Sequence, residues 1–148
     1  MRYTLLGVEL NPVTQAAAEK LIEQWLDEQP NHPKIVFTPN PEIIVYAQSQ
    51  ANYRTLLNRG DLNVADGIGL IWLSQKQLPE RITGTDLLTT VIQEGKARQL
   101  KIGVVLKPTG LSSTHDLPGM ITTYDRFSQT PDIIVVAVGF PEQENYPR

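Results

Sequence analysis

The chain has 148 residues, the length of one domain, and its 41% apolar and 20% charged residues are typical of a globular fold and exclude an intrinsically disordered segment. Its 16 acidic and 13 basic side chains give a formal charge of -3, which argues against a nucleic-acid partner. It has no cysteine, which excludes disulfides and thiolate chemistry. It also has no apolar run of the ~20 residues that a membrane-spanning helix needs. We therefore expect a cytoplasmic protein with at most peripheral membrane contact.

The first predicted element is a helix that begins after Asn11 and Pro12, which suit a cap and a first turn. Residues 34–37 then predict a short strand, the proline-rich segment 38–41 a loop, and residues 42–48 a helix. Apolar side chains at helical spacing form the expected buried face of the first helix: Ala18, Leu21, Ile22 and Trp25.

The middle of the chain continues this alternation of helices and strands. Residues 51–59 predict another short helix, and residues 62–65 predict a brief strand. The turn 66–69 then opens an apolar segment, 70–73. Because Trp72 falls in the apolar pattern of this segment, we expect it in the core rather than on a stacking surface.

The last third contains the most apolar segments. Thr85 can cap a helix that begins at Asp86, and the near-continuous apolar runs 101–106 and 132–138 are typical of parallel strands covered on both faces. Residues 108–129 lack a periodic pattern, so we expect irregular or partly ordered structure there. The alternation of strands and helices predicts an α/β fold, a three-layer Rossmann-like domain with a mainly parallel sheet.

Polar loops follow three of the predicted strands, at residues 38–40, 66–69 and 139–144. Because the carboxyl ends of parallel strands open at the same edge of a sheet, we expect these loops to meet and to line one crevice. The sequence therefore predicts a binding or active site at this edge.

Two charged residues in these segments have both a chemical and a structural interpretation. Asp66 beside a glycine turn can act as a general base, or it can cap a helix that begins near Gly67. Arg81 can hold a carboxylate or phosphate with two parallel hydrogen bonds, or it can form a surface ion pair with Glu80 or Asp86. Local sequence alone favours the structural interpretation of both residues.

Other polar residues carry weaker signals. Thr38 and Asn40 can orient a polyhydroxylated ligand, but they also suit ordinary turn chemistry. Gln143 can both donate and accept a hydrogen bond. Because His32 and His115 lack the spacing of metal ligands, we expect no metal site.

Three segments resemble, in order and spacing, the motifs of the WecG/TagA/CpsF glycosyltransferases: Thr38-Pro-Asn40, Asp61-Leu-Asn-Val-Ala-Asp-Gly-Ile-Gly69 and Glu80-Arg-Ile-Thr-Gly-Thr-Asp86. The tail at 138–144 is similar to the closing signature of that family, with Glu142 where a lysine is more usual. The resemblance implies one glycosyltransferase domain over residues 1–148, without the C-terminal appendage of the family. It also implies a reaction that needs no cofactor and no metal.

As the resemblance implies, the reaction is the inverting transfer of N-acetylmannosamine or a related sugar. The donor would be a UDP-sugar and the acceptor a polyprenyl-diphosphate-linked sugar at the inner face of the bacterial membrane. The product would enter a cell-envelope polymer such as teichoic acid or capsule. The expected partners are therefore the donor, the lipid-linked acceptor, the membrane surface and a second copy of the chain.

The resemblance also assigns roles to individual residues. Asp66 would be the base for the acceptor hydroxyl, with Thr38 and Asn40 beside it. Arg81 would face the diphosphate and Gln143 the nucleotide sugar. The remaining motif residues would line the substrate site: Gly67, Gly69, Thr83, Gly84 and Asp86.

One segment departs from the pattern of the family. Where a glycine-rich loop follows the strand in the family, this chain has Lys107-Pro-Thr-Gly110. Few backbone amides can then approach a diphosphate, so we expect weak binding of the UDP-sugar or none. A non-catalytic sugar- or nucleotide-binding domain, or a scaffold of the same fold, is the alternative function.

Overall fold

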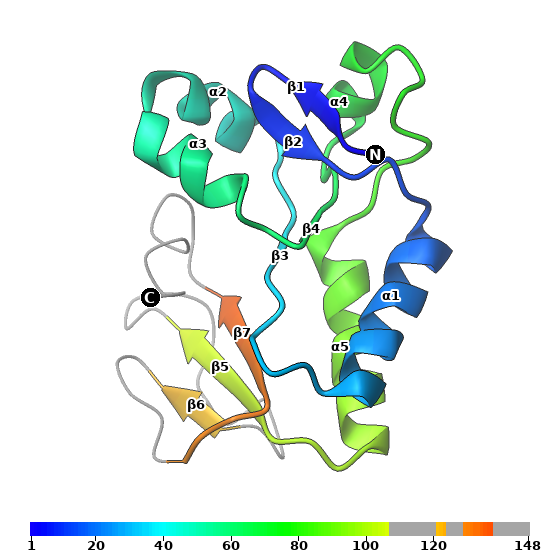
Figure 1. Ribbon diagram of the computed structural model, residues 1–148, viewed down its shortest axis with the longest axis vertical. Helices are drawn as coiled ribbons and strands as arrows, with labels where there is room; N and C mark the ends of the chain where they lie inside the picture. The colour runs from blue at the N-terminus through cyan, green and yellow to red at the C-terminus, as the bar shows by residue number, and fades with distance from the viewer. Residues whose placement is uncertain (107–120, 124–128, 138–148) are drawn as a thin grey trace. The chain divides into compact units, whose positions relative to one another are not determined.

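The computed structural model describes residues 1–106, 121–123 and 129–137, and the chain divides into two units (Figure 1). The first unit covers residues 1–90 and the second begins at residue 91. In the described residues no helix has both the length and the apolar character to cross a membrane.

The first unit opens with a hairpin that the sequence analysis did not predict. Strands β1 (Tyr3–Leu5) and β2 (Val8–Leu10) pair antiparallel, and the turn between them consists of Leu6 and Gly7. Both turn residues have positive φ angles, 50° and 81°, as a type I′ turn requires. Glycine adopts this backbone at little cost, whereas leucine does not, which is why the Leu-Gly pair gave no turn signal.

The first helix, α1 (Gln15–Glu28), begins later than predicted. Its N-cap is Thr14, whose hydroxyl accepts a hydrogen bond from the amide of Ala17. The predicted cap at Asn11 is wrong because this residue is bound elsewhere. Its amide donates to the carbonyl of Asn63, and its side-chain oxygen accepts from the Asn63 amide, both at 2.8 Å.

A pair of short parallel strands lies at the centre of the first unit. Strand β3 (Val36–Phe37) pairs with β4 (Leu62–Asn63), with Val36 opposite Leu62. The two strands are connected through α2 (Pro41–Ser49) and α3 (Ala51–Leu57). The predicted order of strand, helix, helix and strand is confirmed, although both strands are shorter than expected.

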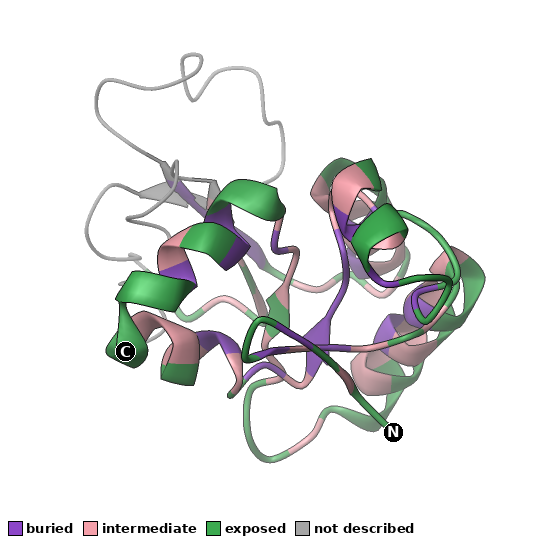
Figure 2. Cartoon of the chain, turned by 90° about the horizontal axis from the view of Figure 1, so that it is seen from above, coloured by how far each residue is buried: buried purple, intermediate pink, exposed green. Residues whose placement is uncertain are grey.

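The elements of the first unit bury a common core (Figure 2). Strand β4 is buried at both of its residues, and the two residues after it, Val64 and Ala65, are buried as well. Side chains from the hairpin, the helices and the segment between α4 and α5 complete the core: Val8, Leu10, Ala18, Ile22, Ile43, Ile44, Ala47, Leu57, Leu70, Leu78, Ile82 and Leu87. The core therefore holds the chain rigidly up to the point where the polar turn at 66–69 begins.

Two helices follow this turn. The short helix α4 (Ile68–Leu73) contains Trp72, which is 74% exposed, so the prediction of a core tryptophan is wrong. A six-residue helix on the surface buries only one side, and Leu70 lies on that side here. The longer helix α5 (Gly84–Ala97) crosses the boundary between the two units.

Helix α5 begins two residues earlier than predicted. The hydroxyl of Thr83 accepts a hydrogen bond from the amide of Asp86 at 3.0 Å and donates one to its carboxylate at 2.6 Å. Thr83 rather than Thr85 therefore provides the capping hydroxyl.

The second unit contains a parallel sheet in the order β6-β5-β7. Strands β5 (Ile102–Leu106) and β7 (Ile133–Ala137) confirm the two predicted apolar strands. Strand β6 (Ile121–Thr123) was not predicted and falls inside 108–129, whose other residues up to 128 lie outside the described residues. Together with β3 and β4, these pairs confirm an α/β chain with parallel strands, consistent with a Rossmann-like fold.

Candidate active site

Two of the three predicted loops lie against each other. The amide of Asp66 donates a hydrogen bond to the carbonyl of Pro39 at 2.9 Å, which joins the loop after β4 to the loop after β3. Gly67 makes this approach possible, because a Cβ atom there would lie 2.6 Å from Cδ of Pro41. The third loop, 139–144 with Gln143, lies outside the described residues.

The carboxylate of Asp66 is held on both oxygens. Oδ1 accepts from Nε of Arg81 at 3.3 Å and from Nη2 at 3.2 Å, and Oδ2 accepts from the amide of Gly84 at 3.1 Å. Gly84 is the first residue of α5, so the carboxylate faces the positive end of a 14-residue helix. Asp66 does not cap α4, whose N-cap is Gly67 and has no side-chain hydrogen bond.

Arg81 forms an ion pair, as one of its two interpretations predicts, but the predicted partners are wrong. Of the two acids proposed from the sequence, Glu80 accepts from the amide of Gln15 at 2.5 Å, and Asp86 is bonded to Thr83. Arg81 instead reaches Asp66, 15 positions back along the chain. Its side chain is 51% exposed, which leaves part of the guanidinium accessible to a ligand.

Thr38 and Asn40 lie on either side of Pro39, whose carbonyl accepts from the amide of Asp66. Thr38 lies beside Gly84, where a Cβ atom would come within 3.0 Å of the threonine hydroxyl. Asn40 caps α2, and its Oδ1 accepts from the amide of Ile43 at 2.9 Å. Asn40 thus has a local structural role at the start of α2, and the cap uses only its side-chain oxygen.

The remaining motif residues are Gly69 and those at the start of α5. A Cβ atom on Gly69 would lie 3.7 Å from Cγ of Pro41, which is an ordinary contact. The structure thus brings together Thr38, Asp66, Arg81 and Gly84, with Asn40, Gly67, Thr83 and Asp86 on the same segments. Among the described residues, no three metal-ligating side chains form a group.

Asn63 lies in β4, shortly before the loop of Asp66, and was not predicted from the sequence. It is fully buried, and its Nδ2 donates to the carbonyls of Glu9 at 2.9 Å and Leu57 at 2.8 Å. Its Oδ1 has no hydrogen-bond partner among the described residues, and a Cβ atom on Gly60 would lie only 2.1 Å from it. An asparagine between Leu62 and Val64 in an apolar strand was the signal that could have identified it.

Asp61 fixes the opposite ends of the two central strands. Its Oδ1 accepts from Nζ of Lys34 and its Oδ2 from the amide of Ile35, both at 3.0 Å. Partial burial acts to raise the pKa of Asp61, but the Ile35 amide and the Lys34 ammonium outweigh it and hold the pKa below its ordinary value. The ionised carboxylate therefore holds the segment before β3 beside the start of β4.

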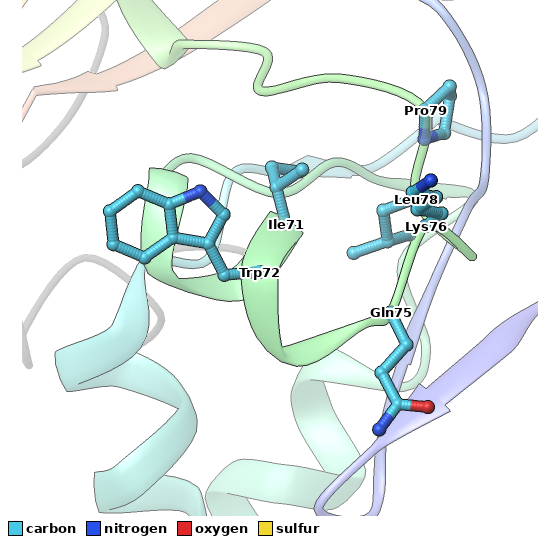
Figure 3. Close-up of a pocket in the computed structure, with 6 residues that line it drawn as sticks. All are labelled: Ile71, Trp72, Gln75, Lys76, Leu78 and Pro79. Carbon is cyan, nitrogen blue, oxygen red and sulfur yellow. The ribbon is translucent and has the colours of Figure 1, made fainter.

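A pocket of about 530 Å³ lies beside α4 (Figure 3). Its walls come from α4 and from the segment that follows it. Gln75 and Lys76 in that segment have φ angles of 51° and 72°, which are uncommon for residues other than glycine. The lining residues are Ile71, Trp72, Gln75, Lys76, Leu78 and Pro79.

Known proteins resemble this chain over the same segments. The model of the glycosyl transferase WecG/TagA/CpsF family matches residues 3–106. The N-acetylglucosaminyldiphosphoundecaprenol N-acetyl-beta-D-mannosaminyltransferase of Bacillus spizizenii strain W23 is 29% identical over 143 aligned positions, covering 81% of this chain and 55% of the relative. The protein of the same name in Staphylococcus aureus strain NCTC 8325 is 25% identical over 165 positions, covering 96% and 65%.

The chain thus spans between about half and two thirds of the length of these relatives. The family match contains the complete cluster of Thr38, Asp66, Arg81 and Gly84. Because this match covers more than half of its residues, the chain belongs to the WecG/TagA/CpsF family of glycosyl transferases.

Proposed function

We propose that the chain transfers N-acetylmannosamine or a related sugar from a UDP donor to a polyprenyl-diphosphate-linked sugar, with inversion and without a metal, in the synthesis of a cell-envelope polymer. The observation that carries the proposal is the carboxylate of Asp66, held between Arg81 and the amide of Gly84 within the family match. The names of the relatives support the transferred sugar and the lipid-linked acceptor.

In this reaction Asp66 removes the proton of the acceptor hydroxyl. The hydroxyl oxygen attacks the anomeric carbon of the donor, and the bond from that carbon to the diphosphate oxygen breaks on the opposite face. UDP leaves with the electrons of that bond, and Arg81 stabilises the charge on the diphosphate. Asp66 keeps the proton until it is released to water.

The ion pair between Arg81 and Asp66 implies that the donor binds before the acceptor is deprotonated. While Arg81 donates two hydrogen bonds to Oδ1 of Asp66, this oxygen is occupied and is not open to the acceptor hydroxyl. A diphosphate that binds Arg81 draws the guanidinium away and frees Oδ1 for the acceptor hydroxyl. The Gly84 amide meanwhile keeps Oδ2 in place.

The remaining residues would bind the two sugars. Thr38 and the NH2 group of Asn40 would contact the acceptor, and Gln143 the nucleotide sugar. Backbone and side-chain groups of Gly67, Gly69, Thr83, Gly84 and Asp86 would line the site. We further propose a three-layer Rossmann-like arrangement, peripheral attachment at the inner face of the membrane and assembly as a homo-oligomer.

The test is release of UDP from UDP-N-acetylmannosamine in the presence of a short-chain lipid diphosphate that carries N-acetylglucosamine. The proposal requires that product formation depends on both substrates and is lost in Asp66→Asn. Calorimetric titration with UDP separates the alternatives, because binding without any transfer identifies a non-catalytic nucleotide-binding domain. If the chain neither binds UDP nor transfers sugar, both functions are contradicted.

A further inference from the structure

Helix α4 presents an apolar side to the solvent. Ile68 is 52% exposed, Trp72 74% and Leu73 62%, whereas Leu70 on the same helix is buried. Ile68 and Trp72 are separated by four positions, which places them one above the other on a helix. Exposure of a tryptophan beside two aliphatic side chains marks an interaction surface rather than an ordinary solvated helix.

The segment after α4 extends this surface with a positive charge. From residue 68 to residue 79 the only charged residue is Lys76, in a chain whose net charge is -3. Lys76 lines the pocket together with Trp72 and Pro79. Its positive φ angle, like that of Gln75, costs free energy that the turn must recover from its surroundings.

We propose that this α4 surface, formed by Ile68, Trp72, Leu73 and Lys76, docks into the interfacial layer of an anionic phospholipid bilayer. Tryptophan favours the depth of the lipid headgroups, and aliphatic side chains reach the start of the acyl chains. The Lys76 ammonium complements the lipid phosphates in sign. The proposal rests on the proposed function, because an undecaprenyl-linked acceptor holds its diphosphate at this depth.

The position of α4 in the chain fits this role. The helix begins two residues after Asp66, and Gly67 is its N-cap. Docking of α4 therefore brings the loop of the proposed base to the membrane surface, where the diphosphate of a lipid-linked acceptor lies. No large movement of the acceptor out of the bilayer is then required.

The size of the surface favours a bilayer over a second copy of the chain. The surface has three exposed apolar side chains, whereas each partner in a stable protein interface buries ~800 Å² over about 20–30 residues. A bilayer sets no such minimum, because each side chain contributes its own transfer free energy. The lysine also opposes self-association, since a twofold contact would bring two ammonium groups together.

The experiment measures binding of the 148-residue chain to vesicles of phosphatidylcholine, with and without phosphatidylglycerol. In a Trp25→Phe background Trp72 is the sole tryptophan. We expect its emission to shift to the blue and to be quenched by brominated lipids when anionic vesicles are present. Trp72→Ser/Leu73→Ser should weaken vesicle binding about tenfold or more, and Lys76→Gln should abolish the preference for anionic vesicles.

Leu6→Asn is the matched control, because Leu6 is another exposed apolar residue, 53% accessible, and lies in the β1–β2 turn. It should bind vesicles like the parent. Equal binding of Trp72→Ser/Leu73→Ser and the parent overturns the proposal. So does a lipid-free dimer, found by sedimentation, that the same double variant dissociates.

A water-soluble acceptor separates this inference from the proposed function. The double variant should retain the parental rate with that acceptor and lose activity with an acceptor embedded in vesicles. A parent that binds vesicles through Trp72 but transfers no sugar to either acceptor would contradict the proposed function and leave the α4 surface supported.

Discussion

Arg81 directs two nitrogen atoms to one and the same oxygen of Asp66, at 3.3 and 3.2 Å, rather than bridging both carboxylate oxygens. The second oxygen accepts a hydrogen bond from the amide of Gly84. A guanidinium bound in this way can leave without releasing the carboxylate from its position. The arrangement thus combines an oriented base with an arginine that is available to an anionic ligand.

Replacement of Asp66 by asparagine should remove sugar transfer while leaving the fold intact. The amide keeps the shape of the side chain but cannot accept the proton, so we expect a loss of about 10²–10⁴-fold in kcat. The free energy of unfolding should change by less than about 1 kcal/mol, because the ion pair with Arg81 is exposed. Steady-state kinetics and urea unfolding measure the two effects.

The matched control is Asp61→Asn, the same change five positions earlier in the same motif. It should lower stability and retain the kcat of the folded fraction, because Asp61 bonds to Lys34 and Ile35 and not to the cluster. Full activity of Asp66→Asn would exclude this residue as the base.

Arg81→Lys should lower kcat/KM by about tenfold although it preserves the charge. One ammonium group cannot donate the parallel hydrogen bonds that a guanidinium offers to a diphosphate, and one such charged hydrogen bond is worth ~1.5–3 kcal/mol. The thermal midpoint should remain unchanged because Arg81 is half exposed. Unchanged kinetics would show that the arginine serves only the surface ion pair with Asp66.

The pH dependence of stability should report on Asp61. Its pKa is lower in the folded chain than in the unfolded chain, so its contribution is complete above the unfolded value of about 3.9 and disappears as the pH falls through the folded value. Unfolding in urea at neutral pH and near pH 3 should show a deficit of Asp61→Asn that shrinks in acid. A deficit that stays constant with pH would mean that the charge of Asp61 contributes nothing.

Asn63→Ala should be among the most destabilising single changes in the first unit. It leaves the buried carbonyls of Glu9 and Leu57 without their donor, at a cost of about 2–4 kcal/mol. Asn63→Asp should cost at least as much at neutral pH, because a carboxylate would face the same carbonyl oxygens. Denaturant unfolding of both variants measures these effects. A decrease of less than about 0.5 kcal/mol in the free energy of unfolding would mean that the carbonyls of Glu9 and Leu57 find other donors.

The fold was predictable where the sequence carries a strong period or a long apolar run. The strands at 102–106 and 133–137 and the helix α1 fall in this class. The hairpin of β1 and β2 was not predictable, because its turn consists of Leu6 and Gly7 rather than of the asparagine and glycine that usually indicate a hairpin turn. The cap of α1 was misplaced because Asn11 binds Asn63, a partner distant in sequence.

The candidate site was predictable through topology and through the family resemblance, not from any single residue. The rule that parallel strands open at one edge placed the loops after β3 and β4 together, and the bond between Asp66 and Pro39 confirms it. The partner of Arg81 could not be predicted from neighbouring residues, since the pairing depends on where α5 begins. The prediction of Trp72 in the core is wrong because an apolar pattern alone does not distinguish the buried side of a helix from an exposed one.

The two glycines of the turn 66–69 should respond differently to alanine. A Cβ atom on Gly67 would lie 2.6 Å from Cδ of Pro41, whereas one on Gly69 would lie 3.7 Å from Cγ. Gly67→Ala must therefore push the loops after β3 and β4 apart, and we expect a loss of about 1–3 kcal/mol of stability together with a strong loss of transfer, because Asp66 moves with its loop. Gly69 lies within α4 at an ordinary contact distance, so Gly69→Ala should stabilise the chain by roughly 0.5–1 kcal/mol. Thermal unfolding and the UDP-release assay of both variants test the relationship, and equal behaviour of the two would show that the contact with Pro41 does not position the proposed base.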